Sequence, residues 1–222
     1  MSFQIAIDGP AGAGKSTIAK LVAERLSFIY VDTGAMYRAI AIGLLKAKAD
    51  IDRDSELQKC CDEMDITIEY HDGEQVVILD GENVNPLLRT EEVTEIASKS
   101  SANPIVRRRL LALQRELSTK YNVVMDGRDI GTVILPNAQV KIFLTARAEV
   151  RAKRRYLEFL EKGIPCDLEE IRRDMEDRDY RDIHREISPL KKADDAVLVD
   201  ASELTIEEVV EKVLSICREK GL

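Results

Sequence analysis

Gly9, Gly14, Lys15 and Ser16 stand in the stretch GPAGAGKS with the spacing G-x-x-x-x-G-K-[ST]. An apolar run precedes this stretch and a helical pattern follows it, which is the context in which the motif forms a phosphate-binding loop. Glycines let successive backbone N–H groups face an anion, Lys15 can reach β- and γ-phosphates, and Ser16 offers a hydroxyl to Mg²⁺. We therefore predict a nucleotide site at Gly9, Pro10, Ala11, Gly12, Ala13, Gly14, Lys15, Ser16 and Thr17.

The alternative is a Gly-rich turn that only links a strand to a helix. Even a true phosphate loop does not name a reaction, because switches, motors and kinases share it. The sequence contains neither a guanine-reading N-K-x-D segment nor a D-x-x-G switch segment, and its length leaves no room for the additional modules of a motor or transporter ATPase. These observations favour a small-molecule kinase.

The elements that must position this loop follow an alternating pattern. Short apolar or β-branched runs predict strands at residues 3–9, 28–34, 122–129, 140–146 and 196–202. Helical periodicity follows most of them, from residue 16 and over residues 35–48, 148–162 and 206–219. Strands that alternate with helices predict an α/β fold with a five-stranded parallel sheet.

Residues 66–85 break this rhythm. They offer two alternating strands joined at Asp72-Gly73, with a third short strand after Asp80-Gly81, which predicts a small antiparallel insertion. Gly163 and Pro165 end one charged helix, and a second begins near residue 166.

Composition limits the classes of partner. The 222 residues are 45% hydrophobic, which predicts one folding unit, and the net charge of −8 argues against a general affinity for nucleic acid or anionic membrane. We find no signal-peptide pattern and no membrane-spanning run, so we expect a cytoplasmic protein. The cysteines lack metal-site spacing and are expected to be ordinary reduced residues: Cys60, Cys61, Cys166 and Cys217.

Four further segments accompany the phosphate loop: DTGAMYR (residues 32–38), ANPIVR (102–107), DGRDIGT (126–132) and RDYRDIHR (178–185). Together they resemble the bacterial-type cytidylate kinases, a family of nucleoside monophosphate kinases with P-loops. The resemblance extends from Ile5 to the last predicted helix. It implies phosphoryl transfer from ATP to CMP or dCMP, with Mg²⁺ as the cofactor and Ser16 as a metal-binding residue.

The resemblance also assigns roles to residues. The catalytic set is Lys15, Arg128, Arg178 and Arg185, and Arg154 joins the ATP site. The CMP site is Thr33, Tyr37, Arg38, Ser98, Arg107, Arg128, Asp129, Arg178, Asp182 and Arg185. Many arginines suit this task because a guanidinium group stays charged and binds phosphate in a bidentate manner, and phosphoryl transfer gains mostly from positioning and charge neutralisation.

Several roles keep alternatives. Asp129 either reads the cytosine ring or orients an arginine, and the basic segment RAKRR at residues 151–155 is either part of a lid or an ordinary helix face. Asp126 either holds Mg²⁺ through water or caps the turn at Gly127. We expect Asp8 to anchor the phosphate loop or a nearby water rather than act as a base, and the role of Arg181 stays open.

The resemblance predicts a P-loop α/β core with an inserted antiparallel nucleotide-binding subdomain and a mobile lid. The single domain 1–222 then divides into a core (1–63, 94–161 and 174–222), an insert near 64–93 and a lid near 162–173. The expected partners are ATP and CMP or dCMP, with no nucleic acid and no membrane, and the chain is expected to be a monomer. The alternatives are a broader UMP/CMP kinase and a nucleotide-binding switch without a small-molecule acceptor.

Overall fold

The computed structural model describes residues 2–71 and 73–222. A five-stranded sheet forms the centre of the molecule, in the order β2-β6-β1-β7-β8. All four neighbouring pairs run parallel, as predicted. The strands are β1 (Gln4–Asp8), β2 (Ile29–Asp32), β6 (Val123–Gly127), β7 (Val140–Thr145) and β8 (Val197–Asp200).

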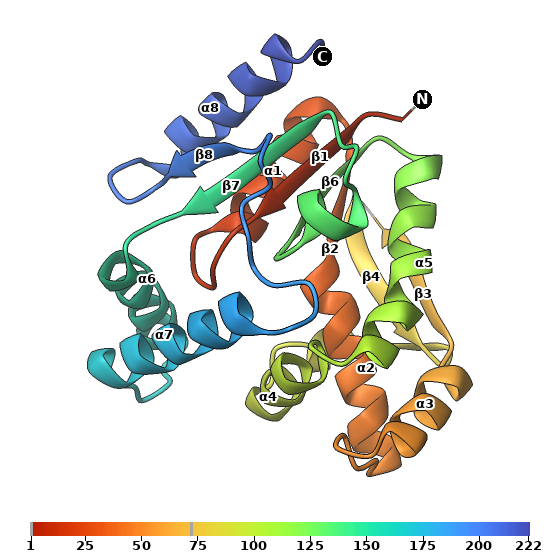
Figure 1. Ribbon diagram of the computed structural model, residues 1–222. Coiled ribbons are helices and arrows are strands. Elements are labelled where there is room, and N and C mark those ends of the chain that lie inside the picture. Colours follow the sequence, from red (N-terminus) through yellow and green to blue (C-terminus); the bar gives the residue numbers. More distant parts are fainter. Residues whose placement is uncertain (1, 72) are drawn as a thin grey trace.

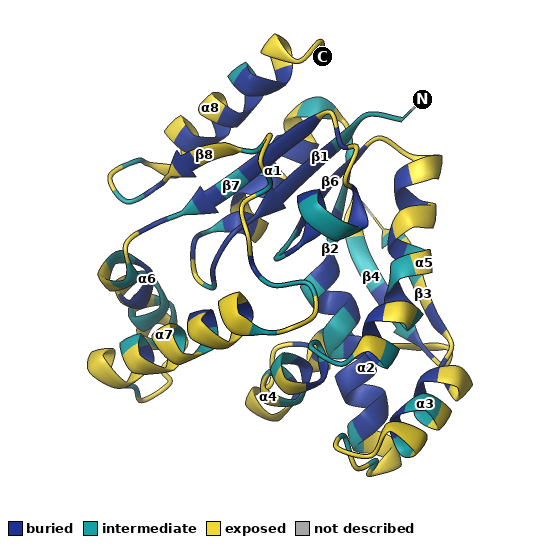
Figure 2. Cartoon of the chain, in the orientation of Figure 1, coloured by how far each residue is buried: buried dark blue, intermediate teal, exposed yellow. Residues whose placement is uncertain are grey.

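Alternating side chains of the sheet enter two apolar layers, because successive residues of a strand point to opposite faces. Ile5 and Ile7 of β1 join a buried cluster with the helices α1 (Lys15–Leu26) and α8 (Ile206–Glu219). Ala6 between them joins the other cluster, with α2 (Thr33–Ala47) and α5 (Pro104–Lys120). The sheet is therefore covered on both faces, and its central strands are coloured as buried in Figure 2.

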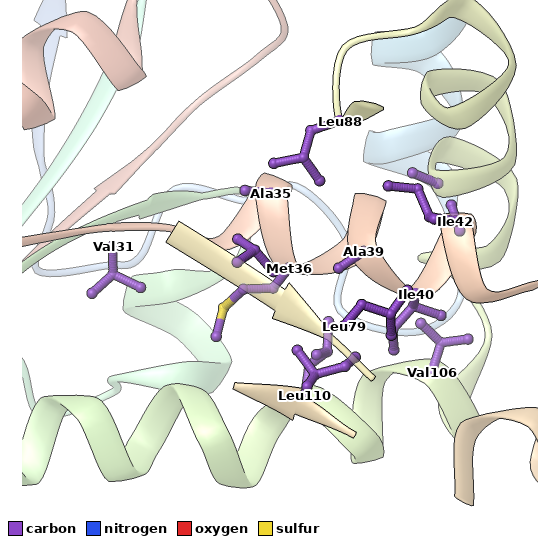
Figure 3. Packing of buried hydrophobic residues seen from close by; sticks show 14 of the residues in the cluster. Val31, Ala35, Met36, Ala39, Ile40, Ile42, Leu79, Leu88, Val106 and Leu110 are labelled. Carbon is purple, nitrogen blue, oxygen red and sulfur yellow. The ribbon is translucent and has the colours of Figure 1, made fainter. Parts of the chain in front are cut away.

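The second layer continues into the insertion. It contains β3 (Ile66–His71), β4 (Glu74–Leu79) and β5 (Glu82–Asn83), which form an antiparallel sheet. Met36, Leu79 and Leu110 belong to one buried cluster, and Figure 3 shows them close together between α2, the small sheet and α5. The predicted three-stranded insertion is thus confirmed, although Asp72 of its predicted turn lies outside the described residues.

Three helices were not predicted from the pattern: α3 (Asp54–Glu63), α4 (Glu91–Ser100) and α5. A short 3₁₀ turn, η1 (Asn85–Leu87), links the small sheet to α4. The helices α6 (Ala148–Glu161) and α7 (Leu168–His184) lie side by side, and the carboxyl ends of β1 and β7 point toward them (Figure 1). No helix in the described part of the chain has the length and apolar character needed to cross a membrane.

All five predicted strands end one or two residues earlier than expected, and two of them lead into helical turns. The strand predicted to reach residue 34 ends at Asp32, because the Asp32 side chain accepts a hydrogen bond from the backbone N–H of Ala35 and starts α2 at Thr33. The strand predicted to reach residue 129 ends at Gly127, and a π-helical turn, η2, follows at Ile130–Ile134. Likewise, α1 begins at Lys15, one residue before its predicted start.

Candidate active site

The predicted phosphate loop joins β1 to α1 at the carboxyl edge of the sheet. Gly9 has a φ of +152°, and a Cβ atom there would lie 1.9 Å from the carbonyl oxygen of Leu144 in β7. Gly14 has a φ of +91° and immediately precedes α1, so the chain enters the helix from a left-handed conformation. The loop thus has its predicted strand–turn–helix context, with the N-terminus of α1 facing out of it.

Lys15 is buried within the loop, with 6% of its surface exposed. Its Nζ donates to the carbonyl oxygen of Pro10 at 2.7 Å. Burial lowers the pKa of Lys15, and the positive charges of Arg128 and Arg178 lower it further, against the opposing effect of Asp126. The negative charge of a bound phosphate would raise the pKa of Lys15 again, so Lys15 is expected to bind phosphate in its charged form.

Ser16, Asp126 and Tyr30 form a group of oxygen atoms beside the loop. Ser16 Oγ donates to Asp126 Oδ2 at 2.9 Å, and the Tyr30 hydroxyl donates to Asp126 Oδ1 at 3.0 Å. Burial raises the pKa of Asp126, assisted by the charge of Asp32. The carboxylate therefore faces Ser16 on one side and Tyr30 on the other, and a hydroxyl beside a carboxylate suits Mg²⁺.

Asp8 holds the turn that follows β6. Its two carboxylate oxygens accept from the backbone N–H groups of Ile130 and Gly131, both at 2.7 Å. Burial raises the pKa of Asp8 to about 6, while these two hydrogen bonds oppose the rise. Asp8 therefore anchors the turn η2, and not the phosphate loop for which the anchoring role was predicted.

A cluster of cationic side chains converges beside Lys15. Arg128 Nε donates to Asp182 Oδ2 at 2.8 Å, and burial of the Asp182 carboxyl is outweighed by Arg128, which keeps the pKa of Asp182 below its usual range. Burial lowers the pKa of Arg178 to about 10, and the charges of Arg128 and Arg38 contribute to the lowering. Such a concentration of positive charge favours an anionic ligand.

Two of these arginines have buried donors without partners. Among the described residues, Arg178 Nε and Arg185 Nη2 have no hydrogen-bond partner. A buried donor without a partner carries a free-energy cost, and a phosphate oxygen would satisfy it. The two atoms therefore mark positions where a ligand is expected to contact the protein.

Comparisons with known proteins agree with this geometry. The family model described as "Cytidylate kinase" matches residues 5–219. The chain belongs to the cytidylate kinase family. It is 51% identical over 218 residues to the cytidylate kinase of Lactobacillus johnsonii, covering 98% of this chain and 95% of the relative. It is also 51% identical over 219 residues to the cytidylate kinase of Carboxydothermus hydrogenoformans, covering 99% of each chain.

Solved structures with low sequence identity share the fold. A shikimate kinase from Acinetobacter baumannii, solved with shikimate, is 16% identical with a TM-score of 0.51, and 100% of this chain and 96% of that chain are covered. An uncharacterised protein from Eubacterium ventriosum is 12% identical with a TM-score of 0.55, and 99% of each chain is covered. These similarities show the fold alone, which is that of a P-loop kinase.

Within the cytidylate kinase family fold, Arg107 and Asp129, two of the three residues predicted to read the base, lie in contact. Arg107 Nη2 bonds Asp129 Oδ2, and Arg107 Nη1 donates to the carbonyl oxygen of Ser101 at 3.2 Å. The Arg107 guanidinium lies 5.7 Å from the ring centre of Tyr37. Burial raises the pKa of Tyr37 to about 12, with Arg107 opposing the rise. Ser98 lies in the last turn of α4, three residues before Ser101.

Asp129 orients arginines, as one of its two predicted alternatives required. Besides Arg107, it faces Arg185, whose Nη2 lies 3.7 Å from Asp129 Oδ1. Burial raises the pKa of Asp129, while Arg107 and Arg185 oppose the rise. Arg185 Nε donates to the carbonyl oxygen of Ser188 at 2.7 Å, which fixes the side chain at the end of α7. The contacts do not test whether Asp129 also reads a base.

Thr33 and the small sheet meet at the start of α2. Thr33 Oγ1 donates to the backbone carbonyl oxygen of Asp126 at 2.6 Å, which ties α2 to β6. Gln75 of β4 accepts from the N–H of Asp32 at 2.9 Å and donates to its carbonyl oxygen at 3.2 Å. The helix that carries Thr33, Tyr37 and Arg38 is therefore anchored to both sheets.

Among the residues that the structure describes, the side chains of Arg154 and Arg181 show no hydrogen bond or ion pair to the residues of the cationic cluster. Arg154 Nη2 donates to the carbonyl oxygen of Ala201, just after β8, at 2.6 Å. Arg181 is exposed on α7. The role of Arg154 toward ATP stays a prediction, and the structure gives no contact that assigns Arg181 to the site.

Sequence reasoning missed four residues that hold the site in place: Tyr30, Gln75, Arg151 and Asp179. Arg151 and Asp179 fall in the segments RAKRR and RDYRDIHR, so their location was flagged but their role was not. Tyr30 and Gln75 lie in ordinary strand patterns, and no local signal separates them from other strand residues.

Proposed function

We propose that this chain transfers the γ-phosphoryl group of ATP to CMP or dCMP, releasing ADP and CDP or dCDP. The observation that carries this proposal is the cationic cluster of the buried Lys15 and the partly buried Arg128, Arg178 and Arg185, in which two guanidinium nitrogens lack hydrogen-bond partners. Two polyanions must be brought together in this reaction, and a fixed set of cations offsets their repulsion. A protein that bound only one nucleotide would not need this second set of arginines.

The two substrates are assigned to opposite sides of the cluster. The phosphate loop and Lys15 hold the β- and γ-phosphates of ATP, with the N-terminus of α1 aimed at them. Arg38 and Arg128 hold the phosphate of CMP, and the terminal oxygen of that phosphate attacks the γ-phosphorus of ATP. No general base is required, because this oxygen is already an anion near neutral pH. Arg178 and Arg185 stabilise charge on the transferring group.

Mg²⁺ fits the oxygen atoms beside the loop. Ser16 Oγ and the Asp126 carboxylate lie 2.9 Å apart, and both are ligand types that Mg²⁺ accepts directly or through water. When bound, the ion neutralises charge on the β- and γ-phosphates. The contribution of the chain is to hold the Asp126 carboxylate between Ser16 and Tyr30.

Recognition of cytosine is assigned to Arg107, Asp129 and Ser98. Cytosine presents an amino donor beside acceptors at N3 and O2, whereas uracil presents a carbonyl and an N3–H. The Arg107 guanidinium can donate to N3 and O2, and the Asp129 carboxylate or the Ser98 hydroxyl can accept from the amino group. With uracil, like polar groups would face each other without hydrogen bonds.

The proposed lid lies where α6 leads into α7. The connecting residues 162–167 and the first turns of α7 carry the segment predicted at 162–173, and closure there would keep water from the phosphoryl group. The division into core, insert and lid, the monomeric state and the cytoplasmic location stay predictions.

Initial rates of ADP release test the proposed function. The protein is mixed with ATP and Mg²⁺ and with CMP, dCMP, UMP, AMP, GMP or no acceptor, and ADP is measured by a coupled assay. We expect fast release with CMP and dCMP and only slow release without an acceptor. Equal release with and without monophosphate would support a nucleotide-binding switch, and equal rates with CMP and UMP would support the broader UMP/CMP kinase.

A further inference from the structure

Ala11, at the tip of the phosphate loop, is bonded through both of its backbone polar groups. Its N–H donates to Asp179 Oδ1 at 3.2 Å, and its carbonyl oxygen accepts from Arg151 Nη1 at 2.9 Å. The same Arg151 nitrogen donates to Asp179 Oδ2 at 2.6 Å. Three hydrogen bonds therefore form a closed ring around one residue of the loop.

The two side chains in this ring come from α6 and α7, outside the segment 162–173 that is proposed as the lid. Arg151 belongs to the first turn of α6 and Asp179 to α7, and their side chains are only 8% and 12% exposed. Arg151 Nε also donates to the carbonyl oxygen of Ala146 at 2.8 Å, which fixes the guanidinium at the end of β7. Removing one partner of such a buried pair would leave the other charge uncompensated, at a large cost in free energy.

The packing around Gly12, the next residue of the loop, also shows that α6 and α7 contact the loop. A Cβ atom at Gly12 would lie 2.4 Å from Met175 Cε of α7 and 3.3 Å from Arg151 Cβ of α6. Both helices thus approach the loop closely at Gly12, whose φ of +72° independently favours glycine. The loop tip is enclosed by the base of the α6–α7 hairpin, and Figure 1 shows these helices beside the carboxyl ends of β1 and β7.

We propose that Arg151 and Asp179 are positioning residues for ATP, acting through the backbone of Ala11. This inference rests on the proposed function, in which the loop holds the phosphates of ATP. A glycine-rich loop has many accessible conformations, and fixing its tip before the nucleotide binds reduces the conformational entropy lost on binding. The pair also fixes the position of α6 and α7 relative to the loop, so Arg154 on α6 and Arg178 on α7 start from defined positions.

The prediction is a selective loss of ATP binding. Calorimetric titration with the non-hydrolysable β,γ-imido analogue of ATP, and separately with CMP, measures both affinities without turnover. The main variant is Arg151→Met/Asp179→Leu, which removes both charges together and so avoids an unpaired buried ion. We expect its affinity for the ATP analogue to fall about tenfold, the size expected from losing charged hydrogen bonds, and its affinity for CMP to stay within about threefold.

Two further variants separate positioning from folding. Asp179→Asn keeps the shape of the side chain and one acceptor for Ala11, so we expect a smaller loss toward the ATP analogue in the same direction. Arg155→Ala breaks the exposed pair between Arg155 and Glu158 on the same helix α6, at 2.7 Å, and should leave both affinities unchanged. Circular dichroism checks that each variant is folded.

Unchanged affinity of the double variant for the ATP analogue would overturn the proposal. Equal weakening of the ATP analogue and CMP, in the double variant or in Asp179→Asn, would also overturn it, because a merely structural pair would affect both sites. If the wild type binds the ATP analogue but forms no CDP, the proposed function fails, and the same titrations still decide the role of the pair.

Discussion

Replacing Arg178 by Met should stabilise the ligand-free protein while it removes most of the activity. Burial and the neighbouring charges of Arg128 and Arg38 lower the pKa of Arg178 from 12.5 to about 10. This shift corresponds to about 3 kcal/mol of unfavourable free energy for the charged form. The cost is fully present at every pH below about 10, where the folded and unfolded states both hold the proton, and it declines only as the pH rises from about 10 toward 12.5.

Replacing the charged Arg178 side chain by the uncharged Met side chain removes part of that unfavourable free energy. Structural relaxation and water entry reduce the gain to about 1 to 2 kcal/mol, and the nearby carboxylates remain paired because Arg128 holds Asp182 and Arg151 holds Asp179. In a chain of this size, that gain raises Tm by about 3–6 °C. Loss of a fixed cation at the transferring group should lower kcat by about 10²- to 10³-fold.

Thermal melts followed by circular dichroism, together with ADP-release rates, test this prediction. Arg181→Met is the matched control, since Arg181 is exposed on the same helix α7 and should change neither quantity. A lower Tm for Arg178→Met would refute the reasoning, because it would mean that the buried guanidinium contributes to the stability of the ligand-free fold. Full activity in that variant would remove Arg178 from the mechanism.

Other changes separate the remaining parts of the site. Lys15→Ala should keep the far-UV spectrum and lose several orders of magnitude in kcat; an active variant would contradict the role of the loop. Arg128→Ala should raise KM for CMP much more than KM for ATP, and equal increases would contradict its assignment. Burial raises the pKa of Asp8 to about 6 in the folded protein, from 3.8 in the unfolded chain, so the folded state binds the proton of Asp8 more tightly. The free energy of unfolding that this proton contributes is fully present below pH 3.8 and is lost as the pH rises to about 6. Urea titrations from pH 4 to 7 should show a flatter profile for Asp8→Asn, and parallel profiles would refute this.

Local patterns in the sequence were enough to predict the central sheet and the phosphate loop. The motif from Gly9 to Ser16 is contiguous, and each strand of the sheet is a short apolar run between turn residues, so both signals lie within a few neighbouring positions. The helices α3, α4 and α5 were missed although each buries apolar residues against the second core layer. The start of α5 does carry a local signal, because Asn103 caps the helix and Pro104 occupies its first position.

The parts of the site that could not be predicted depend on contacts between distant segments. Asp179 is 168 residues from Ala11 and Arg151 is 140 residues from it, yet the three form one ring of hydrogen bonds. Gln75 is 43 residues from Asp32, and nothing in the strand pattern indicates that its amide pairs with that backbone. By contrast, an ion pair between Asp129 and an unspecified arginine was one predicted alternative, and the structure pairs Asp129 with Arg107.

A competition between CMP and UMP tests the central claim most directly. Equimolar CMP and UMP are incubated with the wild-type protein, Mg²⁺ and limiting ATP, and CDP and UDP are separated by ion-exchange chromatography at low conversion. Sites that leave polar groups without partners can discriminate by up to about 10⁴-fold, so we predict at least about a hundredfold excess of CDP over UDP. Similar amounts of CDP and UDP would contradict the assignment of Arg107, Asp129 and Ser98 to cytosine, and absence of both products would contradict the proposed reaction itself.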